Sequence, residues 1–276
     1  MQRIIIGALL AMLCLPVSAQ AFKLEGHLVQ GGMAIGRVHP NATVYFQGKP
    51  VRVSPEGFFV IGFSRDAEPE TIIELHQASG TVEKHPVRIE KRTYQIQRID
   101  GLPPRKVTPS AEDLKRIRKD IALVKAVRKK DDPRTDFLQP FIWPVSGRIS
   151  GVYGSQRILN GKPKRPHYGV DIAAPTGTPV KAPADGVVSL VHNDMFYSGG
   201  TLIVDHGHGL STTYMHLHKI LVKDGQRVKQ GDVIAQVGAT GRVTGPHLHW
   251  GMNWFDTRLD PSLLVPPMPE ATAAAQ

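Results

Sequence analysis

Three patterns of hydrophobic and polar residues follow one another along the chain. From residue 22 to about residue 100, short runs of β-branched and aromatic residues, as at 42–46, 57–63 and 71–75, are separated by Gly, Pro and Asn. Strand patterns at such regular spacing are typical of a small β-sandwich. We therefore expect a β-sandwich-like accessory domain over residues 22–100, with a binding or spacer role because it contains no group of chemically reactive side chains.

A helical pattern follows the sequence Gly101-Leu102-Pro103-Pro104. Ser110 is placed as an N-cap, and Asp113 stands at the third helical position, as in a capping box. The spacing of apolar residues predicts a helix over residues 111–130, within a linker over residues 101–135. The apolar positions are Leu114, Ile117, Ile121, Val124 and Val127. The other face carries the basic residues Lys115, Arg116, Arg118, Lys119, Lys125, Arg128 and Lys129.

The third pattern, over residues 136–265, is rich in Gly and in β-type runs. The runs at 186–191 and 201–206 predict a pair of strands, and the run at 233–238 predicts another. The fold class is therefore expected to be mainly β, with the linker helix between the sandwich-like domain and a Gly-rich antiparallel sheet. A Pro- and Ala-rich tail over residues 266–276 is expected to be disordered.

The first residues predict export. Arg3 precedes an apolar stretch over residues 4–17, and small residues suited to cleavage follow at Ala19 and Ala21. This arrangement is typical of a signal peptide over residues 1–21, either cleaved or retained as an anchor, and it predicts a periplasmic or secreted protein. Cys14, the single cysteine, lies inside the apolar stretch. A cleaved chain would contain no thiol, so any metal site must be built from His and carboxylate side chains.

The charge balance adds a possible class of partner. The formal net charge is +10 and the isoelectric point is near 9.8, which favours association with polyanions. Nucleic acid is a poor partner for an exported chain. The basic helix is either the solvated side of a connecting element or a contact for anionic wall polymer or a membrane surface.

The third segment also contains most of the histidines. In His167-Tyr168-Gly169-Val170-Asp171, an imidazole and a carboxylate four positions apart would share a face if these residues formed a strand. In His247-Leu248-His249, two rings two positions apart would share a face of a strand. Two imidazoles and a carboxylate are a ligand set of catalytic zinc sites, in which water takes the fourth position. A further histidine near the metal would be available for acid–base or oxyanion chemistry, and the arrangement Tyr214-Met215-His216-Leu217-His218 supplies a candidate.

In sequence order, these motifs resemble the lysostaphin/LytM-type zinc endopeptidases, which cut peptidoglycan. The similarity extends over about residues 140–262 and includes Ile172-Ala173-Ala174-Pro175 after the first motif and Gly245-Pro246 before the second. The resemblance implies that zinc is held by His167, Asp171 and His249. It also implies that His247 and His216 assist catalysis beside the metal. The sandwich-like domain resembles, more loosely, the accessory domains of such peptidases in Gram-negative bacteria.

The function implied by the resemblance is hydrolysis of peptide bonds in peptidoglycan stem peptides or cross-bridges during cell-wall remodelling. The alternative is a non-catalytic wall-binding module or an activator of another wall hydrolase. For either function, three roles are open for the N-terminal part: to inhibit by blocking the groove, to recruit a regulatory protein partner, or to target the protein by contacting glycan. Runs such as 228–235 also resemble biotinyl- or lipoyl-carrier folds, but no lysine stands in the hairpin that such carriers modify.

Overall fold

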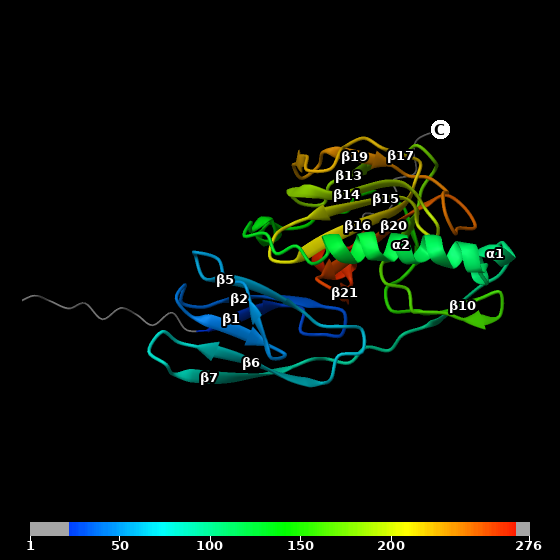
Figure 1. Cartoon of the computed structure of the whole chain (residues 1–276). Coiled ribbons are helices and arrows are strands. Elements are labelled where there is room, and N and C mark those ends of the chain that lie inside the picture. The colour runs from blue at the N-terminus through cyan, green and yellow to red at the C-terminus, as the bar shows by residue number, and fades with distance from the viewer. Residues whose placement is uncertain (1–21, 269–276) are drawn as a thin grey trace, which may run out of the picture.

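The computed structural model describes residues 22–268. Strands dominate these residues, which confirms the mainly β fold class, and Figure 1 shows two β-rich blocks with the helix lying across the upper one. The expected signal peptide, and residues 269–276 of the expected tail, lie outside the described residues. No described helix has the length and hydrophobicity needed to span a bilayer. The domain limits drawn above stay predictions.

The N-terminal block consists of two antiparallel sheets. One has the order β1-β2-β5, and the other has the order β4-β3-β6-β7. Apolar residues from both sheets, including Val44, Phe59 and Ile73, form one buried core between them, which is the arrangement of a β-sandwich. The strands are β1 (Lys23–Gly26), β2 (Met33–Arg37), β3 (Thr43–Phe46), β4 (Lys49–Val51), β5 (Phe58–Gly62), β6 (Glu70–His76) and β7 (Val82–Arg88).

After β8 (Ile96–Ile99) and the short helix α1 (Pro104–Val107), the chain enters α2 (Ala111–Val127). The expected capping box is present: Ser110 Oγ accepts a hydrogen bond from the Asp113 backbone N–H, and Asp113 accepts one from the Ser110 backbone N–H. Arg105 contacts the same carboxylate, with Nε donating to Oδ2 over 2.7 Å. Arg105 lowers the pKa of Asp113 to about 2, so both a cap and an ion pair fix the start of α2.

The faces of α2 differ from the sequence prediction. Val124 and Val127 pack against β14 and β15, and Ile117 is also buried. Leu114 and Ile121, expected on the same face, are 42% and 55% exposed. The expected apolar stripe was too wide because the strands beneath the helix cover only part of its circumference.

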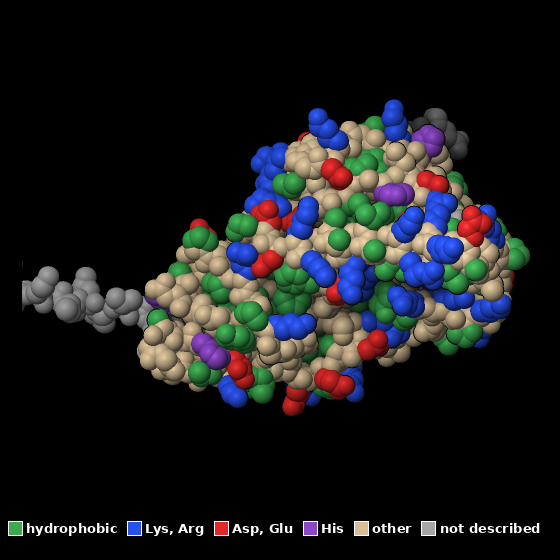
Figure 2. Space-filling model, viewed as in Figure 1, with side chains coloured by type: hydrophobic (Ala, Val, Ile, Leu, Met, Phe, Trp, Pro, Cys, Tyr) green, Lys and Arg blue, Asp and Glu red, His purple; other side chains and the backbone are tan. Residues whose placement is uncertain are grey.

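The basic face of α2 is also less uniform than expected. Arg128 is buried and donates from Nη2 to Thr213 Oγ1 over 3.1 Å, and Arg116 pairs with Asp194 over 2.7 Å. The other predicted basic residues are exposed, and Figure 2 shows Lys and Arg side chains gathered over this helix among green apolar atoms. Part of the basic pattern therefore anchors the helix, and part remains on the surface.

One antiparallel sheet forms the centre of the C-terminal block. Its order is β18-β14-β15-β16-β20-β12-β9, and β21 also pairs with β20. The predicted pairing of the runs near 186–191 and 201–206 is confirmed by the β14–β15 register, in which Val188 lies opposite Val204. The strands are β9 (Arg148–Gly151), β12 (Val170–Ala173), β14 (Gly186–Met195), β15 (Gly199–Asp205), β16 (Leu210–Leu217), β18 (Arg227–Val228), β20 (His247–Trp254) and β21 (Thr257–Leu259).

Two three-stranded sheets accompany the central sheet. The first, in the order β13-β19-β17, covers one side of a core that includes Val180, Ile234 and Trp250. The second, in the order β11-β10-β8, joins the chain that follows the sandwich sheets to the C-terminal block, because β8 pairs in parallel with β10. The remaining elements are β10 (Gln156–Leu159), β11 (Lys162–Pro163), β13 (Pro179–Lys181), β17 (Lys219–Ile220), β19 (Val233–Gln236), η1 (Asp136–Leu138) and η2 (Pro261–Leu264).

The two blocks share packing as well as this strand pairing. Met33 and Val60 of the sandwich belong to one buried cluster with Leu210 and Met252 of the central sheet. Arg92, after β7, pairs with the buried Asp260 over 2.9 Å. The sandwich is therefore fixed against the sheet by apolar and charged contacts.

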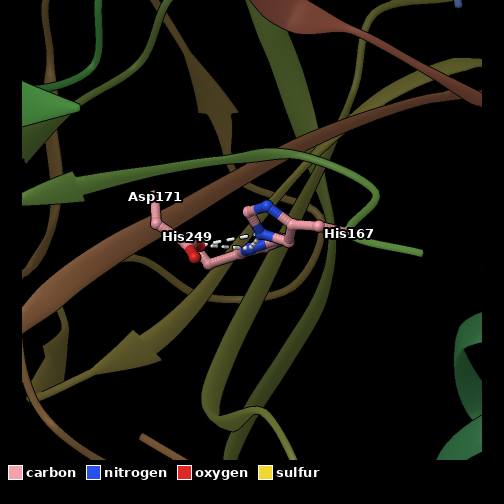
Figure 3. A group of neighbouring side chains, drawn as sticks. All are labelled: His167, Asp171 and His249. Atoms are coloured by element: carbon pink, nitrogen blue, oxygen red, sulfur yellow. Dashed lines mark hydrogen bonds and ion pairs between the residues drawn. The ribbon is translucent and has the colours of Figure 1, made fainter. Parts of the chain in front are cut away.

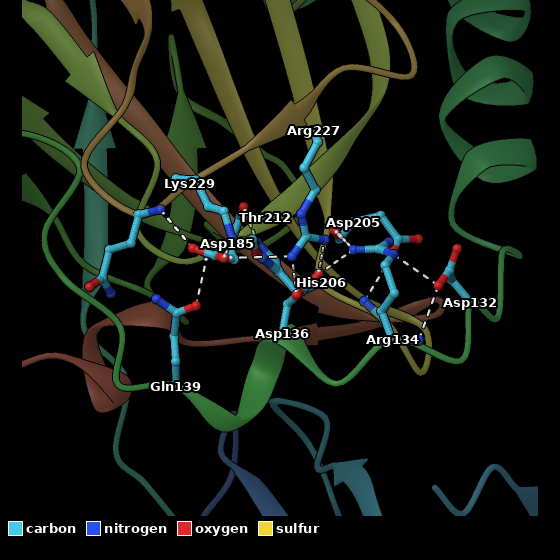
Figure 4. A network of polar contacts seen from close by, with 12 residues as sticks. Asp132, Arg134, Asp136, Gln139, Asp185, Asp205, His206, Thr212, Arg227 and Lys229 are labelled. Carbon is cyan, nitrogen blue, oxygen red and sulfur yellow. Dashed lines mark hydrogen bonds and ion pairs between the residues drawn. The ribbon is translucent and has the colours of Figure 1, made fainter. Parts of the chain in front are cut away.

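A polar network joins the chain after α2 to strands β15 and β18 of the central sheet (Figure 4). Arg134 Nη2 donates to Asp205 Oδ1 over 2.7 Å, and Arg227 makes two hydrogen bonds to Asp136 over 2.6 and 2.7 Å. His206 lies within this region, where its ring nitrogens contact the Asp185 carbonyl oxygen at 2.6 Å and Thr212 Oγ1 at 2.8 Å. Several of the basic residues that give the chain its net charge thus have a structural role.

His206 predicts an acid-dependent loss of stability. Burial lowers the pKa of His206 to about 4 from the ordinary 6.5. Between pH 6.5 and pH 4, His206 is therefore protonated in the unfolded chain but stays neutral in the folded chain. The free energy of unfolding falls as the pH drops through this range. We expect this residue to contribute up to about 3 kcal/mol of that loss. Urea unfolding near pH 7 and near pH 4.5 should show a shallower pH dependence in His206→Gln, and an unchanged dependence would contradict the prediction.

Candidate metal centre

The register of β12 and β20 brings Asp171 and His249 together. These residues lie directly opposite each other on the two antiparallel strands, where side chains on one face are neighbours. The position of His167 differs from the prediction, because it lies in a loop before β12 and does not share a strand with Asp171. Backbone hydrogen bonds from His167 N to Ser155 O and from Gly154 N to His167 O hold the loop.

The three side chains converge on one point (Figure 3). Asp171 Oδ1 lies 2.9 Å from His167 Nε2 and 2.8 Å from His249 Nδ1, and the two ring nitrogens are 2.9 Å apart. All three residues are buried, with at most 7% exposure. Among the described residues, they form a group whose ligand atoms all lie within 4.8 Å of one another, as a single metal ion requires.

The protonation pattern of this group fits a cation. His167 Nδ1 lies 3.1 Å from the Val152 carbonyl oxygen, which can only accept, so Nδ1 carries a proton and Nε2 is the ring nitrogen that can bind a metal. Although burial opposes ionisation, hydrogen bonds from His167 and His249 hold the pKa of Asp171 well below its usual value. Burial lowers the pKa of His249 to about 4. An ionised carboxylate and neutral imidazoles are the forms that bind a divalent metal.

The structure also brings His247 and His216 to this group. His247 Nε2 is 3.8 Å from Asp171 Oδ1, and the rings of His216 and His247 have centroids 4.9 Å apart. Each donates its Nδ1 proton to a backbone carbonyl, His216 to Thr240 and His247 to Gly245, both over 2.9 Å. In the neutral form of each ring, Nε2 is therefore left as an acceptor. Burial and the neighbouring His247 and His249 hold the pKa of His216 well below its usual value.

His216 adopts a backbone conformation that is uncommon for a residue with a side chain. Its φ angle is +66°, in the left-handed region, at the end of β16. Its backbone N–H donates to Ser198 O over 2.8 Å. Conformations of this kind cost free energy and gather at functional sites, where the surrounding structure maintains them.

Arg157 is a member of the site that the sequence analysis missed. Its Nη2 donates to Asp171 Oδ2 over 2.7 Å, so the two carboxylate oxygens have different partners. Burial lowers the pKa of Arg157, against the opposing effect of Asp171. Little in the sequence signals this contact, because Arg157 is one of 34 basic residues and lies 14 positions from its partner.

Gly169 leaves the space that His249 occupies. A Cβ atom at this position would lie 2.7 Å from two atoms of the His249 ring and 2.6 Å from the Trp250 carbonyl oxygen. A side chain here would displace the ring, so the glycine of His167-Tyr168-Gly169-Val170-Asp171 has a steric role.

Four other histidines of this segment lie outside the group. His206 belongs to the network described above, and His208 is buried beside Phe137, with ring centroids 5.0 Å apart. His192 Nδ1 accepts a hydrogen bond from Asp194 N, and His218 is exposed. None of these four histidines was expected to take part in the site.

Comparisons with known proteins agree on one family. Residues 165–261 match the sequence profile described as peptidase family M23. Peptidoglycan DD-endopeptidase ShyA of Vibrio cholerae is 49% identical over 112 residues, which are 39% of this chain and 26% of ShyA. DD-carboxypeptidase/endopeptidase Mpg of Neisseria meningitidis is 37% identical over 137 residues, 50% of this chain and 31% of Mpg. This chain thus spans less than a third of either curated relative.

A solved structure extends the similarity beyond the peptidase segment. A Pseudomonas aeruginosa protein assigned to peptidase M23 is 35% identical in sequence, with a TM-score of 0.67. The match covers 86% of this chain and 94% of that one. The shared region therefore includes most of the N-terminal block as well as the segment with the histidines.

Proposed function

This chain belongs to peptidase family M23, and we propose that it is an exported zinc endopeptidase that hydrolyses peptide bonds in peptidoglycan. The family match confirms the resemblance to lysostaphin/LytM-type metallopeptidases that the motifs indicated. The observation that carries the proposal is the convergence of His167, Asp171 and His249, with a proton pattern that suits a metal ion. Zinc is favoured because the donors are two imidazoles and one carboxylate.

The surrounding residues have roles that follow from their orientation. When bound, zinc would polarise a substrate carbonyl and make a water molecule acidic enough to lose a proton near neutral pH. His167, Asp171 and His249 would hold the ion. His247 and His216 present Nε2 towards the same space, where one can accept a proton from the attacking water. Once protonated, the same ring can donate to the negative oxygen or the leaving amine.

The substrate is proposed from the names of similar proteins. ShyA is named a peptidoglycan DD-endopeptidase, and Mpg a DD-carboxypeptidase/endopeptidase. We extend this to a D,D peptide bond in peptidoglycan cross-links, which lies outside the cytoplasm and agrees with the export predicted from residues 1–21. The alternative, a non-catalytic activator of another hydrolase, is disfavoured because all five expected site residues are present and gathered together.

We also propose that α2 contacts an anionic membrane surface. Leu114, Arg118, Ile121 and Lys125 are all exposed and recur at a spacing that places them along one side of the helix. Exposed apolar residues among cations are typical of helices that lie in a lipid interface. Anionic wall polymer would use the charges but would gain little from Leu114 and Ile121, so lipid is the favoured partner.

The proposed activity is tested on purified sacculi. The native protein loaded with zinc should release shortened muropeptides from D,D cross-links, as identified by mass spectrometry. A chelator or the substitution His249→Ala should remove the activity, because either removes the metal site. Intact cleavage by His249→Ala, or release of uncut material only, would contradict the proposal.

The two histidines beside the ligands should separate catalysis from metal binding. His216→Ala and His247→Ala are expected to retain stoichiometric zinc, since neither residue is among the three ligands. The rate constant for cleavage should fall by about 10²- to 10⁴-fold, the usual contribution of a general acid or base. Zinc content by atomic absorption and steady-state rates provide the two measurements. Loss of zinc in either variant would instead make that histidine a ligand.

The membrane contact is tested by co-sedimentation with vesicles of phosphatidylglycerol or phosphatidylcholine. The native protein should sediment with the anionic vesicles. Both Leu114→Ser/Ile121→Ser and Arg118→Gln/Lys125→Gln should reduce this binding, because lipid contact uses apolar and charged residues together. A loss in the charge variant alone would point to polyanion binding and overturn the lipid proposal.

A further inference from the structure

One short segment supports two of the three proposed ligands. Residues 152–157 connect β9 to the start of β10. At one end, the Val152 carbonyl oxygen receives the Nδ1 proton of His167 over 3.1 Å. At the other end, Arg157 Nη2 donates to Asp171 Oδ2 over 2.7 Å. The position of this segment therefore controls the orientation of both an imidazole and a carboxylate.

The same segment is held on its other side by residues that precede the peptidase segment in sequence. Arg65 Nε donates to the Gly154 carbonyl oxygen over 2.7 Å, and the Arg65 guanidinium lies over the Tyr94 ring, 4.1 Å from its centroid. Gly154 has a φ angle of +83°, and a Cβ atom at this position would overlap the Tyr94 ring. Arg65 of the sandwich block and Tyr94 of the chain after it thus both contact the segment at Gly154.

Strand β8 continues this contact along β10. Gln97 lies opposite Arg157 in the parallel register, and Gln156 N donates to Gln95 O over 2.8 Å. Gln97 Oε1 accepts a hydrogen bond from Arg157 Nε over 3.4 Å, while its Nε2 donates to Ser150 O of β9, also over 3.4 Å. The side chain of Arg157, which orients Asp171, is therefore itself oriented by strand β8.

We infer that the N-terminal block and β8 position the metal ligands. Arg157 is the positioning residue, because it contacts β8 through Gln97 and orients the Asp171 carboxylate. The accessory region then completes the metal centre, in addition to any targeting or inhibitory role. This inference rests on the proposed function only in assuming that His167, Asp171 and His249 bind a metal.

The chemistry of Arg157 explains why an arginine is needed. Its guanidinium neutralises one oxygen of a buried carboxylate and leaves the other directed at the two imidazoles. The rigid fork also lets Nε reach Gln97 while Nη2 holds Asp171. A lysine would retain the charge but could not link β8 to the carboxylate in this way.

The test measures the zinc affinity of the full-length chain, by competition with a chelator of known affinity. We expect Arg157→Gln to weaken zinc binding by about 10- to 100-fold, the usual effect of removing a group that orients a metal ligand. Arg157→Lys should recover part of this loss. Gln97→Ala and Arg65→Ala, which lie outside the metal centre, should weaken binding by smaller factors because they loosen Arg157 and Gly154.

A matched control is Arg52→Ala, which removes the ion pair between the N-terminal block and Asp131, 2.8 Å long, without touching residues 152–157. Its zinc affinity should equal that of the native chain. The melting temperature of each zinc-free variant shows whether the fold survives. Native zinc affinity in Arg157→Gln, or equal losses in Arg52→Ala and Arg65→Ala, would overturn the inference. Absence of zinc binding by the native chain would instead contradict the proposed function.

Discussion

The constraint on which this structure depends is the burial of an ionised carboxylate. Asp171 is 7% exposed, and a charge withdrawn from water must be compensated by partners in fixed positions. The structure divides the two oxygens: Oδ1 faces His167 and His249, while Oδ2 is bound by Arg157. The arrangement around Asp171 thus gives one oxygen to two imidazoles and the other to the cationic side chain of Arg157.

Most of the remaining architecture holds these partners in place. Backbone carbonyl groups of Val152, Thr240 and Gly245 select one tautomer of three different histidines, so loops far apart in the sequence determine where each Nε2 points. The central sheet supplies the rigid register that places Asp171 opposite His249. A site on strands with its orienting groups on packed loops is preorganised, which reduces the cost of binding a metal or reaching a transition state.

The basic composition has a different meaning in the folded chain than in the sequence. Arg134, Arg227 and Arg128 all bind partners within the C-terminal block, and Arg92 joins it to the sandwich. These charges stabilise the fold, because each guanidinium joins chain segments that are far apart in the sequence. Net charge therefore overstates the surface available to an anionic partner, and the exposed residues of α2 are the part of that surface with a regular arrangement.

Local patterns in the sequence determined much of this protein. Alternating apolar runs predicted the strand pairing, Ser110 and Asp113 predicted the start of α2, and the histidine motifs predicted the group of residues that the structure gathers. These features depend on neighbours in the chain, and local spacing carries that information. Tertiary structure alone decided that His167 would approach from a loop, that Leu114 and Ile121 would stay exposed, and that Arg157 would bind Asp171. Such contacts depend on which surfaces meet after folding, and no spacing along the chain encodes that.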